Sequence, residues 1–255
     1  MSEPAPLSGL GVLVTRPAAQ AEGLCLLLEE RGARVQRLPL LAIEPARAAP
    51  PLLQRFHDHR DAAGWIFTSR NAVQQARRLD SGAWPARLYA VGAATAAALE
   101  ELGQGALIPP GVYSGEGLLQ HPQLQDVAGR RFLLVTGADG LDHIAAGLRA
   151  RGAAVEVAEV YRRVALPHAP AQVEAALQHC AAIVLTSGEA LAQLWRLTPP
   201  ELQPELRRRR LAVPSARVVE QAQALGFEQP LVPEQVSDAA FVRCLERWWT
   251  QPGPT

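Results

Sequence analysis

The chain has 255 residues, nearly half of them hydrophobic, and its 25 basic and 25 acidic residues give a formal net charge of zero. A chain of this length holds one large or two ordinary domains. Zero net charge provides no global field that would gather nucleic acid or anionic lipid. No apolar run approaches the roughly 18 residues that a membrane-spanning helix needs. We therefore expect no nucleic-acid partner and no membrane span.

The residue types that are missing or scarce narrow the chemistry further. Every basic residue is Arg, so the chain lacks the lysine of a P-loop or of a Schiff base. Cys25, Cys180 and Cys244 are isolated and lie among apolar helical positions, which is typical of buried free thiols in a reducing compartment. The first residues show neither the basic segment nor the apolar segment of a signal peptide. These features predict a cytoplasmic protein without a metal or an organic cofactor.

Short apolar runs alternate with amphipathic helical patterns along the chain. Residues 18–31 form the first predicted helix, which Gly32 ends. Several strand runs are apolar almost throughout, which indicates parallel strands covered by helices on both faces. The βαβα alternation favours an α/β fold with doubly wound parallel sheets. Strands are predicted at residues 11–14, 65–68, 88–91, 107–109, 132–135, 155–160, 183–186, 211–213 and 231–232.

The chain carries the same βα pattern twice. The segment GVLVTRP, for example, returns as RFLLVTG, and each is followed by a helix and a second strand. Two copies indicate two similar α/β lobes, and two lobes imply a cleft in which a ligand binds. The repeats alone divide the chain near Ala128. The matching pairs are residues 11–17 with 131–137, 65–72 with 182–190, and 87–103 with 210–226.

Small and polar residues follow the strands in both copies, where each strand gives way to a helix. In a parallel sheet these turns meet at the carboxyl edge, where ligands of α/β proteins bind. Each helix start offers unpaired N–H groups and the positive end of the helix dipole, which suits carboxylate or phosphate. The alternative for any single hydroxyl is that it caps its helix. The binding candidates are Thr15, Arg16, Ser69, Arg70, Asn71, Ala94, Thr95, Gly137, Ser187, Gly188 and Ser215.

Taken together, these helix starts favour a surface that holds a large polyanion through main-chain amides. Such binding needs no net positive charge, which fits a neutral chain. Arg16 and Arg70 are candidates for pairing with carboxylates, and a solvated or helix-capping role is equally open. Asn71 is expected mainly to organise the start of its helix.

Three other patterns have simpler structural explanations. The run HDHRD at residues 57–61 contains metal-ligand types, yet it fits a solvated helix end. Gly9 and Gly11 precede a strand, whereas the phosphate-binding turn of a dinucleotide site follows one. The four Arg residues at 207–210 fit a solvated face that leads into a strand, rather than a nucleic-acid site.

The order and spacing of the repeated segments resemble the uroporphyrinogen-III synthase family. None of the segments alone is as specific as a metal-ligand pattern, but their order and spacing together are fairly specific. The resemblance covers Gly11 to about Val242. In VPSARV the chain lacks a Thr that some members place after the strand, although the helix start that offers amides remains. The segments are VLVTRP, IFTSRNAV, YAVGAATAAAL, LLVTGADG, VYRRV, VLTSGEAL and VPSARV.

The resemblance implies two flavodoxin-like, doubly wound domains, each with five parallel strands, joined by a two-stranded linker with a cleft between them. One domain would be discontinuous and the other continuous. The implied first domain is residues 1–38 with 167–255, the second is residues 44–159, and the linkers are residues 39–43 and 160–166.

The resemblance also implies a reaction and a substrate. The substrate is hydroxymethylbilane, a linear tetrapyrrole rich in carboxylates. The reaction is that of a hydro-lyase, which removes the terminal hydroxyl as water, closes the ring and inverts the last pyrrole to give uroporphyrinogen III. Because the substrate also closes by itself to the uninverted isomer, the protein has to control conformation more than to supply a strong acid or base. The implied protein is a monomer that needs no cofactor.

The resemblance singles out one side chain as a candidate acid. Tyr161, in the segment VYRRV, matches the family's tyrosine beside the second linker. Its phenol would donate a hydrogen bond to the departing hydroxyl. The alternative is a tyrosine that packs at a domain junction with its hydroxyl facing water.

Two other functions fit a two-lobed chain. The first is a small-molecule binding or sensing protein that uses the same cleft without turnover. The second is a glycosyltransferase built from two Rossmann-like lobes. The chain is short for a glycosyltransferase, and no segment can be assigned to a nucleotide diphosphate.

Overall fold

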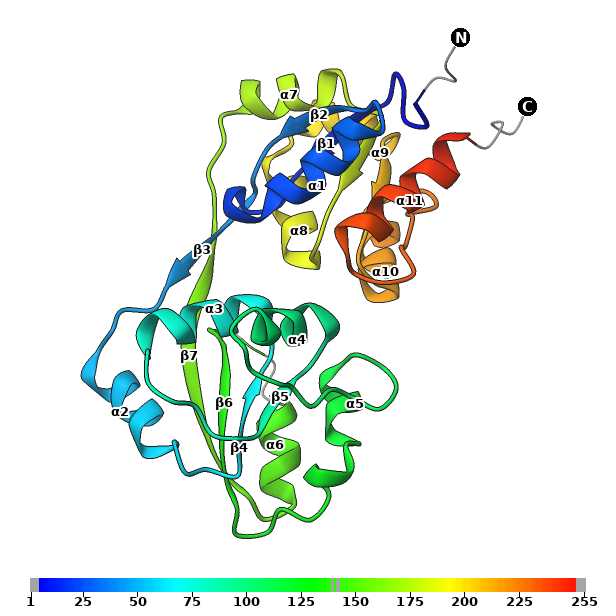
Figure 1. Ribbon diagram of the computed structural model, residues 1–255. Coiled ribbons are helices and arrows are strands. Elements are labelled where there is room, and N and C mark those ends of the chain that lie inside the picture. The colour runs from blue at the N-terminus through cyan, green and yellow to red at the C-terminus, as the bar shows by residue number, and fades with distance from the viewer. Residues whose placement is uncertain (1–4, 139, 141–142, 251–255) are drawn as a thin grey trace. The chain divides into compact units, whose positions relative to one another are not determined.

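The computed structural model describes residues 5–138, 140 and 143–250 and divides into two compact units (Figure 1). The first unit contains the residues up to Ala42 together with those from Val164 onward, and the second is Ile43–Arg163. The chain passes from one unit to the other twice, in the neighbouring strands β3 (Leu41–Pro45) and β7 (Ala154–Ala165).

The first unit contains a parallel sheet in the order β2-β1-β8-β9. The central strand β1 is fully buried because helices cover both faces of the sheet. Alternate residues of β1 face opposite sides, so that Val12 and Val14 contact one apolar cluster and Leu13 contacts the other. The strands are β1 (Gly11–Val14), β2 (Arg34–Arg37), β8 (Ala182–Val184) and β9 (Arg210–Ala212).

Helices α1 and α11 lie together on one face of this sheet, where Leu24 of α1 and Phe241 of α11 belong to the same core (Figure 1). Helices α7, α8 and α10 contribute to the core of the other face, through residues such as Val173 and Leu191. The helices are α1 (Ala18–Glu30), α7 (Pro170–Gln178), α8 (Gly188–Leu197), the 3-10 turn η2 (Pro200–Leu202), α9 (Gln203–Arg207), α10 (Ala216–Ala224) and α11 (Asp238–Thr250).

The second unit contains the parallel strands β7-β6-β4-β5, with β3 at the edge beside β7. One face is covered by α2, α3 and α4, whose Phe56, Val73 and Leu99 share a core with Trp65. The other face is covered by α5 and α6. The elements are α2 (Pro50–Asp58), β4 (Gly64–Phe67), α3 (Arg70–Leu79), β5 (Leu88–Ala90), α4 (Ala93–Glu100), α5 (Gly115–Leu119), η1 (Pro122–Leu124), β6 (Arg131–Gly137) and α6 (His143–Ala150).

The two sheets are copies of one arrangement, as the sequence repeats predict. Strand β6 repeats β1, β7 follows β6 as β2 follows β1, and β4 and β5 repeat β8 and β9. The orders β7-β6-β4-β5 and β2-β1-β8-β9 therefore correspond strand for strand. Both follow the flavodoxin-like order, with the first strand of the repeat between its second and third. In the second unit, however, the β6–α6–β7 segment comes last in the chain instead of first.

The expected fifth strands are shorter than predicted. Each is reduced to a single parallel bridge, Tyr89 with Leu107 in the second unit and Ala212 with Leu231 in the first. Proline is the physical reason, because it has no N–H to donate to a neighbouring strand. Pro109 and Pro110 follow the first bridge, and prolines at 230 and 233 flank the second.

The described part of the chain agrees with the expected cysteine chemistry. Cys25, Cys180 and Cys244 are free and buried. Burial raises the pKa of the Cys180 thiol to about 11, so that it stays protonated at neutral pH. Among the described helices, none combines the length and the apolar character that crossing a bilayer requires.

Candidate active site

The carboxyl edge of the second unit's sheet carries several of the predicted site residues. Ser69 follows β4, Gly92 follows β5, and Gly137 ends β6. Because β5, β4, β6 and β7 are parallel neighbours, these positions lie along one edge. Tyr161 lies in β7, opposite the end of β6, and so it joins the same edge.

Tyr161 is held in place by an irregularity of the sheet. The pairing of β6 with β7 shifts register between Thr136 and Gly137, which places Gly137 opposite Tyr161. The tyrosine ring then lies over the glycine: a Cβ at Gly137 would stand 2.6 Å from Cζ and 3.0 Å from the phenol oxygen of Tyr161. Glycine at this position therefore leaves the space that the ring occupies. Only 4% of Tyr161 is exposed.

A hydrogen-bond chain leads from a helix start to the phenol. The backbone N–H of Ala72 donates to Ser69 Oγ at 3.1 Å, and Ser69 Oγ lies 3.0 Å from the phenol oxygen of Tyr161. Since Ser69 Oγ already accepts one hydrogen bond, its own O–H can donate to the phenol oxygen. In that arrangement the phenol O–H of Tyr161 keeps its proton for another acceptor.

Two threonines lie beside this series of hydrogen bonds, at the same edge of the sheet. Thr68 Oγ1 donates to Thr136 Oγ1 at 2.9 Å, and this bond ties the end of β4 to the end of β6. The sequence interpretation did not name either residue as a site residue. The only sequence signal was position, because each directly precedes a named candidate, Ser69 or Gly137.

The start of α4 presents backbone amides rather than side chains. Its cap residue, Gly92, has no side chain to occupy the helix end. The N–H groups of Thr95 and Ala96 both bond to Gly92 O, whereas the first N–H groups of a helix have no partner within it. Those groups belong to Ala93 and Ala94, which are exposed. The Thr95 side chain is buried, so its role at this edge is to pack the helix rather than to contact a ligand.

The corresponding edge of the first unit carries Thr15 and Arg16. Both side chains have partners within that unit, one through a hydrogen bond and the other through an ion pair. Thr15 is buried, and its Oγ1 donates to Val184 O at 2.8 Å, which ties β1 to β8. Arg16 forms an ion pair with Asp238 and lies over the ring of Phe241 at 5.8 Å. Asp238 is 222 residues away in sequence, so no local pattern could have indicated this partner.

The remaining candidates occupy helix starts. Gly188 lies against Gln221, because a Cβ there would overlap the Gln221 side-chain oxygen. Arg70 is exposed and forms an ion pair with Glu101 at 2.8 Å, and Asn71 lies in the first turn of α3. In the second unit the structure thus brings Ser69, Gly137 and Tyr161 into contact, whereas Arg16 and Arg70 each have an acidic partner.

Two serines in the first unit provide a matched pair for the capping alternative. Ser187 Oγ accepts from the N–H of Ala190 at 3.1 Å, while Ser215, at the same position of α10, makes no side-chain capping bond. We expect Ser187→Ala to lower the free energy of unfolding by about 1 kcal/mol. Ser215→Ala should change it by well under half of that. Urea unfolding of both variants measures the difference, and equal losses would contradict the capping assignment.

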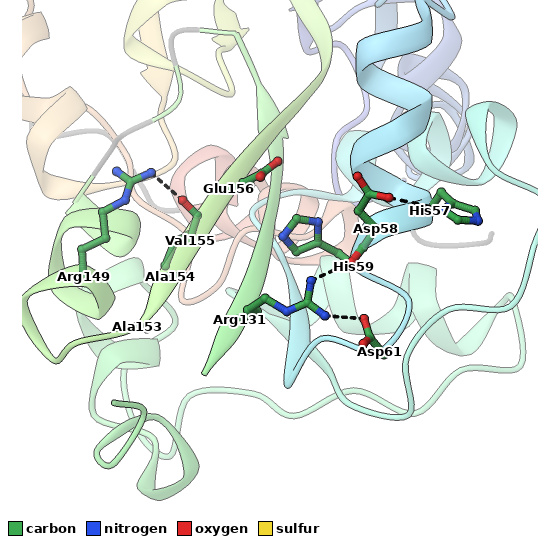
Figure 2. A pocket seen from close by; sticks show the side chains of 10 residues that line it. All are labelled: His57, Asp58, His59, Asp61, Arg131, Arg149, Ala153, Ala154, Val155 and Glu156. Carbon is green, nitrogen blue, oxygen red and sulfur yellow. Dashed lines mark hydrogen bonds and ion pairs between the residues drawn. The ribbon is translucent and has the colours of Figure 1, made fainter. Parts of the chain in front are cut away.

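A cavity of about 860 Å³ lies at the opposite edge of the second unit's sheet (Figure 2). Its walls come from the end of α2 and the starts of β6 and β7. Figure 2 shows the partners of its two arginines: Arg131 contacts Asp61, and Arg149 donates to Val155 O. The lining residues are His57, Asp58, His59, Asp61, Arg131, Arg149, Ala153, Ala154, Val155 and Glu156.

The histidines at this cavity do not make a metal site. His57 is exposed, as expected for a solvated helix end, but His59 is buried and its Nδ1 bonds to Arg55 O at 2.9 Å. A hydrogen bond from Gln54 lowers the pKa of the Asp58 carboxyl. Among the described residues no group of three or more His, Cys, Asp or Glu side chains is arranged to hold a metal ion.

Comparison with known proteins agrees with this geometry. A family profile described as "Uroporphyrinogen-III synthase HemD" matches residues 23–243. The Escherichia coli (strain K12) uroporphyrinogen-III synthase is 33% identical over 247 residues, which cover 93% of this chain and all of that protein. A Synechococcus elongatus uroporphyrinogen-III synthase is 33% identical over 165 residues, 61% of each chain.

Solved structures show the same fold. A mutant uroporphyrinogen III synthase from the extreme thermophile Thermus thermophilus gives a TM-score of 0.65 at 19% identity, covering 95% of this chain and 100% of the other. The Helicobacter pylori 26695 uroporphyrinogen-III synthetase gives a TM-score of 0.61 at 12% identity, covering 94% and 99% of the two chains.

The fold and the polar carboxyl edges define a two-unit α/β protein of the flavodoxin-like type. Together with the sequence matches, they show that the chain belongs to the uroporphyrinogen-III synthase family, hydro-lyases of tetrapyrrole biosynthesis.

Proposed function

We propose that this chain converts hydroxymethylbilane into uroporphyrinogen III, and that Tyr161 donates the proton that leaves with the substrate's hydroxyl. The observation that carries this proposal is the hydrogen bond between Tyr161 and Ser69 at 3.0 Å. The packing of the Tyr161 ring against Gly137 supports it. With Ser69 as the donor, the hydrogen bond fixes the phenol oxygen and leaves the phenol proton available for a second acceptor.

The proposed reaction balances without a cofactor. The C–O bond of the terminal hydroxymethyl group breaks, and the oxygen leaves as water with the proton from Tyr161. The carbon that loses the hydroxyl then bonds to the last pyrrole at the α-carbon that already carries its bridge to the neighbouring ring, which gives a spirocyclic intermediate. The older bond from that α-carbon to the bridge breaks, and the bridge carbon bonds to the free α-carbon of the same pyrrole, which closes the ring with this pyrrole inverted. Ring closure releases one proton from that pyrrole, and the phenolate of Tyr161 takes it back. The net change is loss of one water.

We further propose that main-chain amides at the carboxyl edges hold the substrate's carboxylates. The exposed start of α4 supports this, because Ala93 and Ala94 present N–H groups at the positive end of a helix. The exposed Ser215, which does not cap its helix, marks a similar end in the first unit. In this scheme Arg16 would exchange Asp238 for a substrate carboxylate.

The domain organisation belongs to the same proposal. The two catalytic domains would be residues 1–38 with 167–255 and residues 44–159, linked by 39–43 and 160–166. The enzyme would act as a cytoplasmic monomer. The division into two compact units, with the chain crossing near Ala42 and near Arg163, supports this organisation.

An isomer assay tests the proposal directly. Purified, chelator-treated protein is incubated with hydroxymethylbilane generated by a coupled enzyme, and the product isomers are separated by chromatography. We expect the type III isomer at a rate that added metal ions do not change. Type I product alone, as formed without protein, would leave the chain as a binding or sensing protein. Activity that returns only when a metal ion is added would contradict the proposal that the reaction needs no cofactor.

A further inference from the structure

A fourth repeated segment begins at the shortened fifth strand in each unit. Residues 107–118 read LIPPGVYSGEGL, and residues 231–241 read LVPEQVSDAAF. Each segment runs from the strand bridge to a serine that caps the next helix. Ser114 Oγ accepts from the Gly117 N–H at 3.0 Å, and Ser237 Oγ accepts from the Ala240 N–H at 3.3 Å. We call residues 108–113 and 232–236 the edge loops.

The edge loops expose large apolar side chains. Of the nine large hydrophobic residues that are exposed in the described chain, five lie in these two short segments. Val112 is 75% exposed and Tyr113 is 55% exposed in the second unit, and Val236 is 53% exposed in the first. Clustered exposure of this kind marks a binding surface more often than isolated exposed residues do.

The backbone of the second unit's edge loop is nevertheless closely packed. A Cβ at Gly117 would overlap the carbonyl oxygen of Val112, and the N–H of Ser114 bonds to the same oxygen at 2.9 Å. Contacts with α5 therefore set the path of the loop. Val112 and Tyr113 are therefore exposed although the backbone of their loop is packed.

Tyr113 lies beside the start of α4. A Cβ built on Gly92 would stand 4.0 Å from Cβ of Tyr113, with no other atom within 4 Å. Gly92 follows β5, and Ser69 follows the neighbouring strand β4, which pairs with β5. An exposed aromatic ring thus lies next to exposed helix amides, on the edge that also carries Tyr161.

We propose that Tyr113, with Val112, is the contact surface for one pyrrole ring of the linear tetrapyrrole, and that the neighbouring amides of α4 bind the carboxylates of that ring. This inference rests on the function proposed above. A pyrrole ring is flat, uncharged and electron-rich, and its carboxylates extend from its rim. An aromatic side chain beside a helix N-terminus matches both parts of such a group.

Steady-state kinetics of three variants tests the role of Tyr113. We expect Tyr113→Ala to raise KM by about tenfold with kcat within about twofold, in line with the loss of one stacked ring. Tyr113→Phe keeps the ring and should stay within about twofold of the unmodified protein. Leu102→Ala serves as the matched control, because Leu102 is also exposed in this unit but follows the other end of α4.

Equilibrium binding separates this inference from the proposed function. Uroporphyrinogen III is titrated anaerobically into each variant, so the result does not depend on turnover. Weaker binding by Tyr113→Ala, restored by Tyr113→Phe, supports the pyrrole contact even if the isomer assay fails. Unchanged binding by Tyr113→Ala overturns it, and so does equal weakening by Tyr113→Phe, which would assign the role to the hydroxyl. Absence of type III product overturns the proposed function alone.

Discussion

Replacing Tyr161 by Phe is expected to lower turnover by about 10- to 1000-fold, the range for one general acid when positioning supplies much of the rate. The free energy of unfolding should barely change, because the ring still fills the space above Gly137 and only the bond to Ser69 is lost. Single-turnover rates of type III formation, measured beside urea unfolding, give both quantities.

Two further variants make this result specific. Tyr89→Phe removes another buried tyrosine hydroxyl from the same unit, one that donates to Gln123, and it should keep full activity. Gly137→Ala keeps the phenol but forces the ring of Tyr161 aside, so turnover should fall although every titratable group remains. Wild-type turnover in Tyr161→Phe would remove this residue from the mechanism.

Replacing Ala93 by Pro is expected to lower kcat/KM by about 10- to 100-fold, because it deletes one N–H group that would bind a charged carboxylate. Proline is well tolerated at the first position of a helix. Gly92 before it has the extended backbone that a following proline requires, with φ −155° and ψ 167°. The helix should therefore remain intact, which circular dichroism and thermal unfolding can check.

Ala93→Gly is the matched control for the amide. It removes the methyl group but keeps the N–H, and we expect activity within about threefold of the unmodified protein, since glycine costs only a little helix stability. Equal loss in both variants would indicate that the methyl group or the helix matters. Normal activity in Ala93→Pro would mean that this end of α4 does not hold a carboxylate.

The sequence predicted most of the fold because the relevant signals are local. The apolar run at residues 11–14 became β1 without correction, and the repeated segments became equivalent strands of the two sheets. The fifth strands were wrong in length because prolines beside Leu107 and Leu231 remove donors, and the apolar pattern alone does not register that loss.

The candidate site could be predicted only in part because its contacts are not local. Ser69 and Tyr161 were both named, yet their hydrogen bond joins positions 92 residues apart. The role of Gly137 as a platform for the ring depends on a register shift between two strands, which composition does not reveal. The ion pair of Arg16 with Asp238 joins residues 222 positions apart, so it forms only when the C-terminal helix packs beside the start of the chain.

The discontinuity of the first unit has a consequence for how the chain folds. During synthesis the second unit is a continuous stretch, and all its strands have emerged once β7 is complete. Strand β1 must wait for β8, since Thr15 and its partner Val184 are 169 residues apart. Closing so long a loop is slow, and meanwhile the backbone N–H and C=O groups on one edge of β1 lack their partner strand. The middle of the chain should thus fold first, and newly made N-terminal segments should be where misassembly between chains begins.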